Sequence, residues 1–289
     1  MRRLDLLVPD PANSAYGRRW PPVFEGYAAL FARHGVQLAP HPWTELRDGS
    51  TGGEPATLAV LAWGYHFAPD LWLKRLADWP SGVPLLNPPA VLRWNTRKTY
   101  LAELAAAGAP VVPTLTVAQV DAATLAEGFA RFGTDEIVVK PQVSGAAHRT
   151  ARLRVGEPAP DGLTDALIQP FLPAVESEGE LSLFYFGGRF SHAVRKVAAP
   201  GDFRVQPQFG GLLTAINPGL EAHEAADCVL GAAACGAEPL TYARVDLIRG
   251  RDGRLALMEL EAIEPDLYLD LAPDRGDAFA QAVLSRLER

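Results

Sequence analysis

Acidic residues gather on two neighbouring segments near the C-terminus of the chain. Both segments alternate polar with apolar residues, and Asp252-Gly253 stands between them. This dipeptide, flanked by alternating patterns, is a strong signal for a β-hairpin with a two-residue turn. Counting outward from that turn pairs Asp246 with Glu259 and Arg244 with Glu261.

The predicted pairing places three carboxylates and one guanidinium on a single face, because residues two apart on a strand share a face. The apolar residues between them would pack on the opposite face: Val245, Leu247, Met258 and Leu260. Facing like charges destabilise a sheet, and hard divalent cations with oxygen ligands neutralise them. Asp246, Glu259 and Glu261 are therefore our candidate metal ligands. The alternative is a solvated polar face on which Arg244 balances the acids.

Lysine is rare in this arginine-rich chain and occurs only at Lys74, Lys98, Lys140 and Lys196. A compact ammonium with freely rotating donors suits a phosphate oxygen. Lys74 lies in a pattern typical of a surface helix and requires no ligand. Lys140 ends a β-branched stretch suited to burial, so its charge requires an anionic partner or an exit to solvent.

The composition excludes several classes of partner. A net charge of −7 and a pI of about 5.4 disfavour nucleic acid and anionic membranes, because both require a basic surface. No apolar run has the length needed to span a bilayer, and the N-terminal run is too short for a signal peptide. We therefore expect a cytoplasmic protein that acts on a small molecule, without a nucleic-acid or membrane partner.

The first 90 residues alternate strand and helix patterns, which predicts a small parallel α/β domain with right-handed crossovers. No Gly-x-Gly-x-x-Gly follows the first strand, so dinucleotide binding is not expected. Asn87-Pro88-Pro89 marks the domain boundary. Beyond it, Asn95 would cap a helix that ends at Gly108 and holds Lys98 in its first turn, and another helix would span residues 117–132.

Two loops carry residues suited to phosphate binding. In residues 142–150, Ser144 and Gly145 would let backbone amides approach a phosphate. A plain hairpin connection is the alternative for this loop. Residues 202–211 form a second loop, with Arg204 available to a ligand.

These features follow one another in a fixed order between residues 87 and 270: lysines, a Val-Val-Lys-Pro strand, an Arg-x-Asp strand and a Glu-x-Glu strand. In this order the chain resembles the ATP-grasp superfamily of carboxylate–amine ligases, which includes glutathione synthetase and RimK-like enzymes. Several segments look most like the O-ureidoserine cyclo-ligases of cycloserine biosynthesis: Trp94-Asn-Thr-Arg-Lys98, Gln169-Pro-Phe-Leu-Pro173, Gly188-Arg-Phe-Ser-His-Ala-Val-Arg-Lys196 and Tyr242-Ala-Arg-Val-Asp246.

The resemblance implies a fold of mixed α/β and α+β class. Two α+β subdomains would clasp ATP, and a small Rossmann-like domain, residues 1–90, would precede them. In the ATP-grasp domain, residues 91–289, about residues 113–172 would form the nucleotide-clasping subdomain and about residues 173–289 the metal-binding subdomain.

The same resemblance implies that ATP and Mg²⁺ are the cofactors, with Mn²⁺ as an alternative ion. It assigns the ATP phosphates to Lys98, Lys140, Ser144 and Gly145, the adenine to the backbone of Gln169, Pro170, Phe171 and Leu172, and the ribose to Glu180.

Catalytic cations and metal ligands are implied in the same way. Arg195 and Lys196 would line the triphosphate, Arg204 would lie in a loop over it, and Arg244 would lie near the transferred phosphoryl group. The metal would be held by Asp246, Glu259 and Glu261.

Two positions depart from the pattern of the superfamily. Glu261 stands where many members have Asn and adds a negative charge beside the metal. Glu264-Pro265 replaces the Ser-Pro of glutathione synthetase, a change that would touch the acceptor substrate. Glutathione is therefore not the expected product.

The implied activity is an ATP-dependent ligase that activates a carboxylate as an acylphosphate for attack by a nitrogen nucleophile. An intramolecular cyclo-ligase acting on an O-substituted, serine-like amino acid is the leading hypothesis, which points to antibiotic biosynthesis or amino-acid metabolism. The alternatives are an intermolecular, peptide-forming ligase and a nucleotide-binding module without catalysis. The expected partner is an amino-acid-like carboxylate, and a homodimer stays an open alternative.

Overall fold

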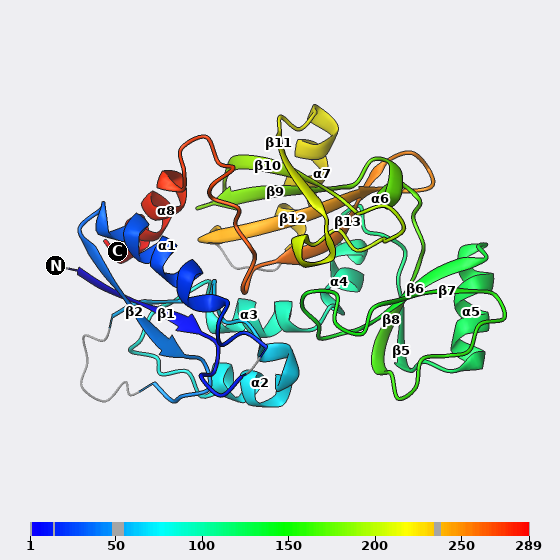
Figure 1. The fold of residues 1–289 in the computed structure, drawn as a ribbon, viewed down its shortest axis with the longest axis horizontal. Helices are drawn as coiled ribbons and strands as arrows, with labels where there is room; N and C mark the ends of the chain where they lie inside the picture. The colour runs from blue at the N-terminus through cyan, green and yellow to red at the C-terminus, as the bar shows by residue number, and fades with distance from the viewer. Residues whose placement is uncertain (1, 14, 48–54, 234–237, 289) are drawn as a thin grey trace.

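Three β-sheets organise the chain (Figure 1). The structure is a computed structural model that describes residues 2–13, 15–47, 55–233 and 238–288. The N-terminal sheet lies at one end of the molecule, a five-stranded sheet lies in the middle, and a second four-stranded sheet lies at the far end.

The N-terminal sheet is parallel, as predicted, with strand order β2-β1-β3-β4. Its elements are β1 (Arg2–Val8), α1 (Trp20–Ala32), β2 (Val36–Pro42), β3 (Thr57–Leu58), the 3₁₀ helix η1 (Tyr65–Phe67), α2 (Pro69–Ala77) and β4 (Leu85–Leu86). Leu6 of β1 packs in one core with Phe31 of α1, whereas Leu7 packs in another with Trp72 of α2. Both faces of β1 are therefore covered, which explains its continuous apolar run.

The middle sheet is antiparallel, with strand order β11-β10-β9-β12-β13. Its strands are β9 (Glu180–Phe186), β10 (Arg189–Val197), β11 (Leu212–Ile216), β12 (Tyr242–Arg249) and β13 (Leu255–Glu261), with α6 (Ala174–Ser177) before β9 and the 3₁₀ helix η2 (Pro207–Phe209) before β11. Helix α7 (Leu220–Ala232) packs on β12 and β13. This sheet presents its other face to the site described below.

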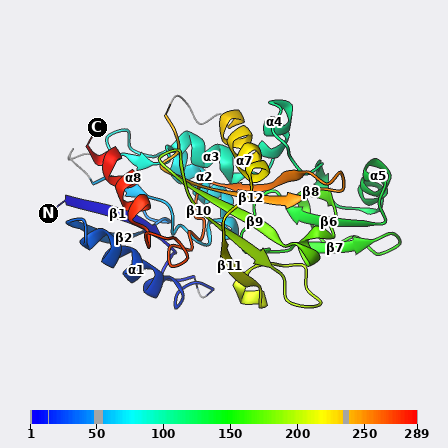
Figure 2. The ribbon, with the colours of Figure 1, turned by 90° about the horizontal axis from the view of Figure 1, so that it is seen from above.

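The far sheet has strand order β5-β8-β6-β7 and is covered by α5 (Ala122–Phe132). Its strands are β5 (Leu115–Gln119), β6 (Glu136–Pro141), β7 (Ala151–Arg154) and β8 (Thr164–Pro170). Helix α8 (Asp277–Leu287) returns to the N-terminal end and lies beside α1 (Figure 2). The last helix thus packs with the first domain, and the division at residues 90, 113 and 173 remains a prediction.

Two predicted helices have different bounds. The helix expected from Asn95 to Gly108 is two helices, α3 (Pro89–Thr96) and α4 (Tyr100–Ala106), because Arg97 is extended. Lys98 lies in the connection rather than in a first helical turn. The stretch expected as a helix from residue 117 begins as strand β5, and α5 starts only after the Asp121 cap.

Asn95 was expected as a helix cap but holds a strand in place. Its side-chain amide donates to the Leu260 carbonyl at 2.8 Å and accepts from the Ala262 amide at 2.9 Å. Tyr100 makes a similar contact, since its hydroxyl donates to the carbonyl and accepts from the amide of Leu260 at 3.0 Å each. These side chains satisfy the edge of β13, so α3 and α4 are fixed to the hairpin that carries the acids.

Asn87 forms the second connection between the N-terminal region and the middle sheet. It is almost fully buried and adopts a left-handed backbone conformation with φ of 65°. Its side chain donates to the carbonyls of Tyr242 and Ala262 and accepts from the Thr241 amide, at 2.8, 2.9 and 2.8 Å. Asn tolerates this conformation better than most residues, and its amide completes three buried backbone groups.

Among the helices in the described ranges, none has the length and apolar run that a bilayer requires.

We predict that Asn87→Ala lowers the free energy of unfolding by about 3 kcal/mol, because three buried partners lose their hydrogen bonds. Urea unfolding followed by circular dichroism measures this loss. Asn217→Ala, at an exposed position, is the matched control and should change stability by less than about 0.5 kcal/mol. An equal effect of both substitutions would contradict the structural role of Asn87.

Candidate active site

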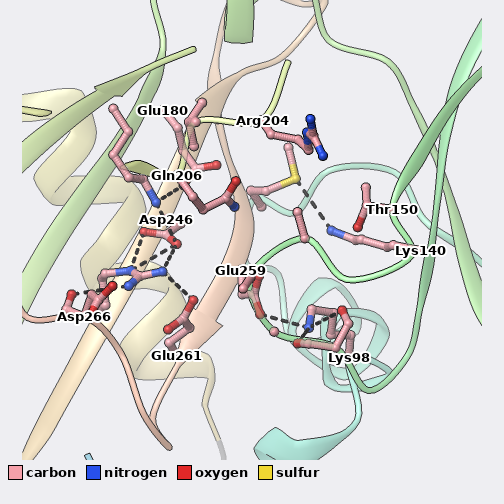
Figure 3. Close-up of a pocket in the computed structure, with 18 of the residues that line it drawn as sticks. Lys98, Lys140, Thr150, Glu180, Arg204, Gln206, Asp246, Glu259, Glu261 and Asp266 are labelled. Carbon is pink, nitrogen blue, oxygen red and sulfur yellow. Dashed lines mark hydrogen bonds and ion pairs between the residues drawn. The ribbon is translucent and has the colours of Figure 1, made fainter. Parts of the chain in front are cut away.

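A cavity of about 230 Å³ lies where the middle sheet and the far sheet meet loops and the 3₁₀ helix η1 of the N-terminal domain. Figure 3 shows Lys98 and Lys140 on one side, Asp246 and Glu261 on the other, and Glu259 between them. Of the residues predicted to bind ligands, the following line this cavity: Lys98, Lys140, Ser144, Gly145, Gln169, Pro170, Phe171, Leu172, Glu180, Lys196, Arg204, Arg244, Asp246, Glu259 and Glu261. The tertiary structure therefore brings together segments that are far apart in the sequence.

The register of the acidic hairpin agrees with the prediction, but its turn does not. Asp246 pairs with Glu259 and Arg244 pairs with Glu261. The strands end at the Arg249 and Leu255 pair, so the connection between them is longer than the two residues expected. A β-bulge compensates for the difference and leaves the acids facing each other.

The bulge is at Met258, which changes the face of that residue. Asp246 pairs with Glu259 and Leu247 pairs with Leu257, so Met258 has no partner on β12. Met258 was expected on the apolar face but lines the cavity, with its Sδ 3.8 Å from Lys140 Nζ. An extra residue in one strand turns the following side chain to the other face, a change that alternation alone does not predict.

Asp246 is the most strongly bound acid of the site. Arg244 donates to it from Nε at 3.0 Å and from Nη2 at 2.9 Å, and Lys196 Nζ lies 3.2 Å from Oδ2. The Ser182 hydroxyl donates to Oδ1 at 2.5 Å. Burial alone would raise the pKa of Asp246, but Arg244, Lys196 and the hydrogen bonds outweigh it and hold the pKa well below its usual range. Asp246 is therefore ionised at neutral pH.

Lys196 and Arg244 extend this network to two further acids. Lys196 forms an ion pair with Glu180, and Arg244 forms one with Glu261. Burial raises the pKa of Glu261 to about 8, since the pull of Arg244 in the opposite direction is partly cancelled by repulsion from Glu259 and Asp246. This network therefore joins three acids, Asp246, Glu180 and Glu261, to two cations, Lys196 and Arg244.

The three predicted metal ligands face the cavity without closing a metal site by themselves. In the described part of the chain, no group of three or more His, Cys, Asp and Glu side chains is arranged to hold a metal ion. Asp246 and Glu261 bind Arg244, and Glu259 lies 3.0 Å from Lys98 Nζ. This donor set fits Mg²⁺, which is usually held by one or two carboxylates while phosphates and waters supply its other ligands.

The two predicted phosphate lysines differ in how their ammonium groups are satisfied. Lys98 Nζ donates to the carbonyl of Ser144 at 2.7 Å and to its hydroxyl at 3.2 Å, and pairs with Glu259. Lys98 thereby holds the loop of residues 142–150 beside β13. Lys140 is equally buried, yet its only hydrogen-bond acceptor within the described ranges is the thioether of Met258.

Lys140 is therefore the site's unsatisfied cation. Burial lowers its pKa to about 8, with repulsion from Lys98 adding to the effect and attraction from Glu259 opposing it. A buried ammonium without an anion is costly, and a phosphate is a group that could neutralise it.

The predicted adenine segment lies at the end of β8. Gln169 is buried and donates to the Thr114 hydroxyl at 2.9 Å, and the Phe171 amide donates to the Glu136 carbonyl at 3.0 Å. Arg204 lies in the loop before η2, where it pairs with Asp202 and its guanidinium covers the Phe209 ring at 3.8 Å. Both segments line the cavity.

Arg195 does not lie where the sequence prediction placed it. Its neighbour Lys196 is buried in the cavity, whereas Arg195 is exposed and lies against Glu178 and Arg249 on the other face of the sheet. Successive residues of a regular strand point to opposite faces, so both cations of the pair cannot face one ligand.

Sequence reasoning also missed a cavity residue from the N-terminal domain. His66 of η1 lines the cavity, and its buried Nδ1 has no hydrogen-bond partner in the described structure. Gln206, in the loop of residues 202–211, also lines the cavity, with its buried Oε1 unpartnered among the described residues. His66 belongs to no recognisable motif, because only the packing of the N-terminal domain brings it to this site.

No family model matches the chain. It is similar to the cycloserine biosynthesis protein DcsG of Streptomyces lavendulae, with 34% identity over 76% of this chain and 82% of that protein. The structure also aligns with the crystal structure of D-cycloserine synthetase DcsG over 99% of each chain, with a TM-score of 0.80 and 28% sequence identity. The ATP-grasp ligase PsnB, complexed with a precursor variant, Mg and ADP, also covers 99% of both chains, with a TM-score of 0.64 and 20% identity.

Lys140→Met should stabilise the protein in the absence of ligand. Since burial lowers the Lys140 pKa from 10.5 to about 8, the charge destabilises the folded state by roughly 3 kcal/mol below pH 8. Between pH 8 and pH 10.5 the unfolded chain binds more protons at Lys140 than the folded protein does. The destabilisation caused by the charge therefore decreases as the pH rises from about 8 to 10.5. Urea unfolding at pH 7 and pH 10 measures the difference.

Lys74→Met is the matched control, because Lys74 is exposed and its ion pair among the described residues is with Asp78 on the surface of α2. It should leave stability nearly unchanged at both pH values. If Lys140→Met raised the free energy of unfolding as much at pH 10 as at pH 7, a buried charge could not be the cause.

Proposed function

The chain belongs to the ATP-grasp carboxylate–amine ligases, and from this premise we propose that it closes a ring within an O-substituted, serine-like amino acid. ATP would activate the carboxylate of that amino acid as an acylphosphate, and a nitrogen of the same molecule would then attack. The relationship to the DcsG protein supports this substrate class, because that relative is named for cycloserine biosynthesis.

The unsatisfied ammonium of Lys140, facing an acid-rich hairpin across one cavity, is the observation that carries the proposal. A triphosphate would supply the anion that Lys140 lacks. Lys196 lies next to Asp246 and would contact the γ-phosphate from the opposite side. The adenine would lie along Gln169, Pro170, Phe171 and Leu172, with Glu180 near the ribose.

Phosphoryl transfer requires positioning and charge neutralisation rather than a protein nucleophile. An oxygen of the substrate carboxylate attacks the γ-phosphorus, and the bond to the ADP oxygen breaks. Bound Mg²⁺, held by Asp246, Glu259 and Glu261, would neutralise phosphate charge during this transfer. Lys140 and Lys196 orient the transferred group, while Ser144 and Gly145 offer backbone amides near it.

Ring closure follows by attack of the nitrogen on the acyl carbon. The carbonyl oxygen gains negative charge as the bond forms, and the carbon–oxygen bond to phosphate then breaks. Arg244 lines the same wall as Asp246 and would stabilise this charge, with Arg204 approaching from the loop before η2.

A screen for ADP release tests the proposal. Purified protein is incubated with ATP, Mg²⁺ and a panel of amino acids and O-substituted serines, with and without added amines. ADP release from O-ureidoserine alone is the expected result. Release that requires a second amine would identify an intermolecular ligase, and nucleotide binding without release from any acid would identify a non-catalytic module.

Asp246→Asn and Lys140→Ala should each lower the rate of ADP release at least about a hundredfold without unfolding the protein. Asp246→Asn removes a charge that Lys196 and Arg244 both neutralise, and Lys140→Ala removes the phosphate partner. Asp252→Asn, in the exposed connection between β12 and β13, is the matched control. Wild-type rates in the two site variants would refute the assignment.

The two neighbouring cations of β10 should behave differently. Arg195→Ala should retain ADP release within about twofold of the wild type, because the side chain faces away from the cavity. Lys196→Ala should abolish it. Steady-state kinetics of both variants measures this contrast. Comparable losses of ADP release in the two variants would contradict a specific role for the Lys196 side chain.

A further inference from the structure

One end of the cavity serves neither the nucleotide nor the metal in the assignments above. It is formed by the N-terminal domain and by the chain that follows β13: Tyr16, Arg19, Trp63, His66, Glu264 and Asp266. These side chains include an imidazole and two carboxylates, which can exchange hydrogen bonds with an amino group. This end of the cavity is therefore a candidate site for the attacking nitrogen.

His66 is buried among aromatic rings and lacks a hydrogen bond at one ring nitrogen. The residue is only 8% exposed, and its Nδ1 has no partner in the part of the chain that the structure describes. Its ring packs against Phe67 at a centroid distance of 4.2 Å and meets Tyr16 edge-on at 6.3 Å. A buried polar atom without a partner destabilises the folded protein, and a hydrogen bond from a ligand would remove this cost.

His66 and Glu264 both approach Gly145. A Cβ atom at Gly145 would lie 3.0 Å from His66 Nδ1 and 3.6 Å from Glu264 Oε1, so any larger residue at position 145 would crowd both polar atoms. All three residues line the cavity, so a ligand nitrogen bound beside Gly145 could contact both side chains.

The surroundings of His66 keep its ring neutral, so that Nδ1 can accept a hydrogen bond. Burial lowers the pKa of His66 to about 4, and nearby His148 and Lys98 add to the effect, so the ring is neutral at pH 7. Glu264 forms no ion pair with a cation of the described ranges, and burial with repulsion from Glu261 raises its pKa. Tyr16 and Tyr65, which flank the ring, are neutral at this pH as well.

We propose that the part of the cavity lined by His66, Gly145 and Glu264 receives the unprotonated nitrogen that attacks the acylphosphate. The inference rests on the proposed function and adds the acceptor subsite to it. Glu264 accepts a hydrogen bond from this nitrogen, and His66 Nδ1 accepts a second one. Together they orient the nitrogen lone pair toward the acyl carbon.

His66 also takes up the proton that ligation releases. When the carbon–nitrogen bond forms, the nitrogen becomes positively charged and far more acidic than a free amine, so a weakly basic imidazole suffices as its acceptor. The proton passes to His66 Nδ1, the carbonyl re-forms, and phosphate leaves with the electron pair of the broken carbon–oxygen bond. The imidazolium then returns the proton to solvent.

A trapping experiment separates acceptor binding from carboxylate activation. O-ureidoserine, together with each acid that releases ADP, is incubated with ATP and Mg²⁺ in the presence of concentrated hydroxylamine, which attacks the acylphosphate without a bound acceptor. The hydroxamate reports activation, and the amide or cyclic product reports use of the acceptor subsite. His66→Phe keeps an aromatic ring beside Phe67, Glu264→Met keeps a side chain of similar length without the oxygen acceptors, and His148→Phe is the matched control outside the cavity lining.

His66→Phe and Glu264→Met should lower ligation product about a hundredfold while hydroxamate stays within about threefold of the wild type. His148→Phe should change neither product. Equal loss of hydroxamate and ligation product in the folded variants, or wild-type ligation in both, would overturn the acceptor assignment alone. Absence of hydroxamate in the wild type with every acid would instead overturn the proposed function, and the acceptor subsite with it.

Discussion

A carboxylate buried between two cations organises the active site. Asp246 is held by Arg244 and Lys196, and these cations extend the network to Glu261 and Glu180. Such a network is stable only if every member keeps its partners, because removing one leaves a desolvated charge. The hairpin of β12 and β13 and the neighbouring β9 and β10 must therefore keep one register. This constraint fixes the wall of the cavity before any ligand binds.

On the opposite wall of the cavity, the ammonium of Lys140 has no anionic partner among the described residues. Lys140 has only the Met258 thioether as an acceptor among the described residues, and burial lowers its pKa. The buried charge thereby destabilises the empty site, and a bound anion would remove that cost. The bulge that turns Met258 toward Lys140 is part of this arrangement, since a regular strand would direct that side chain into the apolar core.

The N-terminal domain contributes to the site as well as to the fold. Asn87, Asn95 and Tyr100 bind backbone groups of β13 and its neighbours, so the hairpin cannot move independently of this region. The same packing brings His66 into the cavity that Gly145 and Glu264 also line. The N-terminal domain would therefore contribute to the approach of the nitrogen, whereas carboxylate activation would depend on residues that follow it.

The sequence alone determined the features that depend on local rules. Alternation and a turn dipeptide paired Asp246 with Glu259, and the scarcity of lysine singled out Lys98, Lys140 and Lys196, which all line the cavity. Only the tertiary structure decided which side chains keep free hydrogen-bonding capacity. Arg195 faces away from the cavity, and the Lys98 ammonium already donates a hydrogen bond to the Ser144 carbonyl. His66 has a buried Nδ1 without a hydrogen-bond partner in the described structure. The reason is physical: spacing along a chain sets the face of a strand, whereas burial and partnering depend on segments that pack from elsewhere.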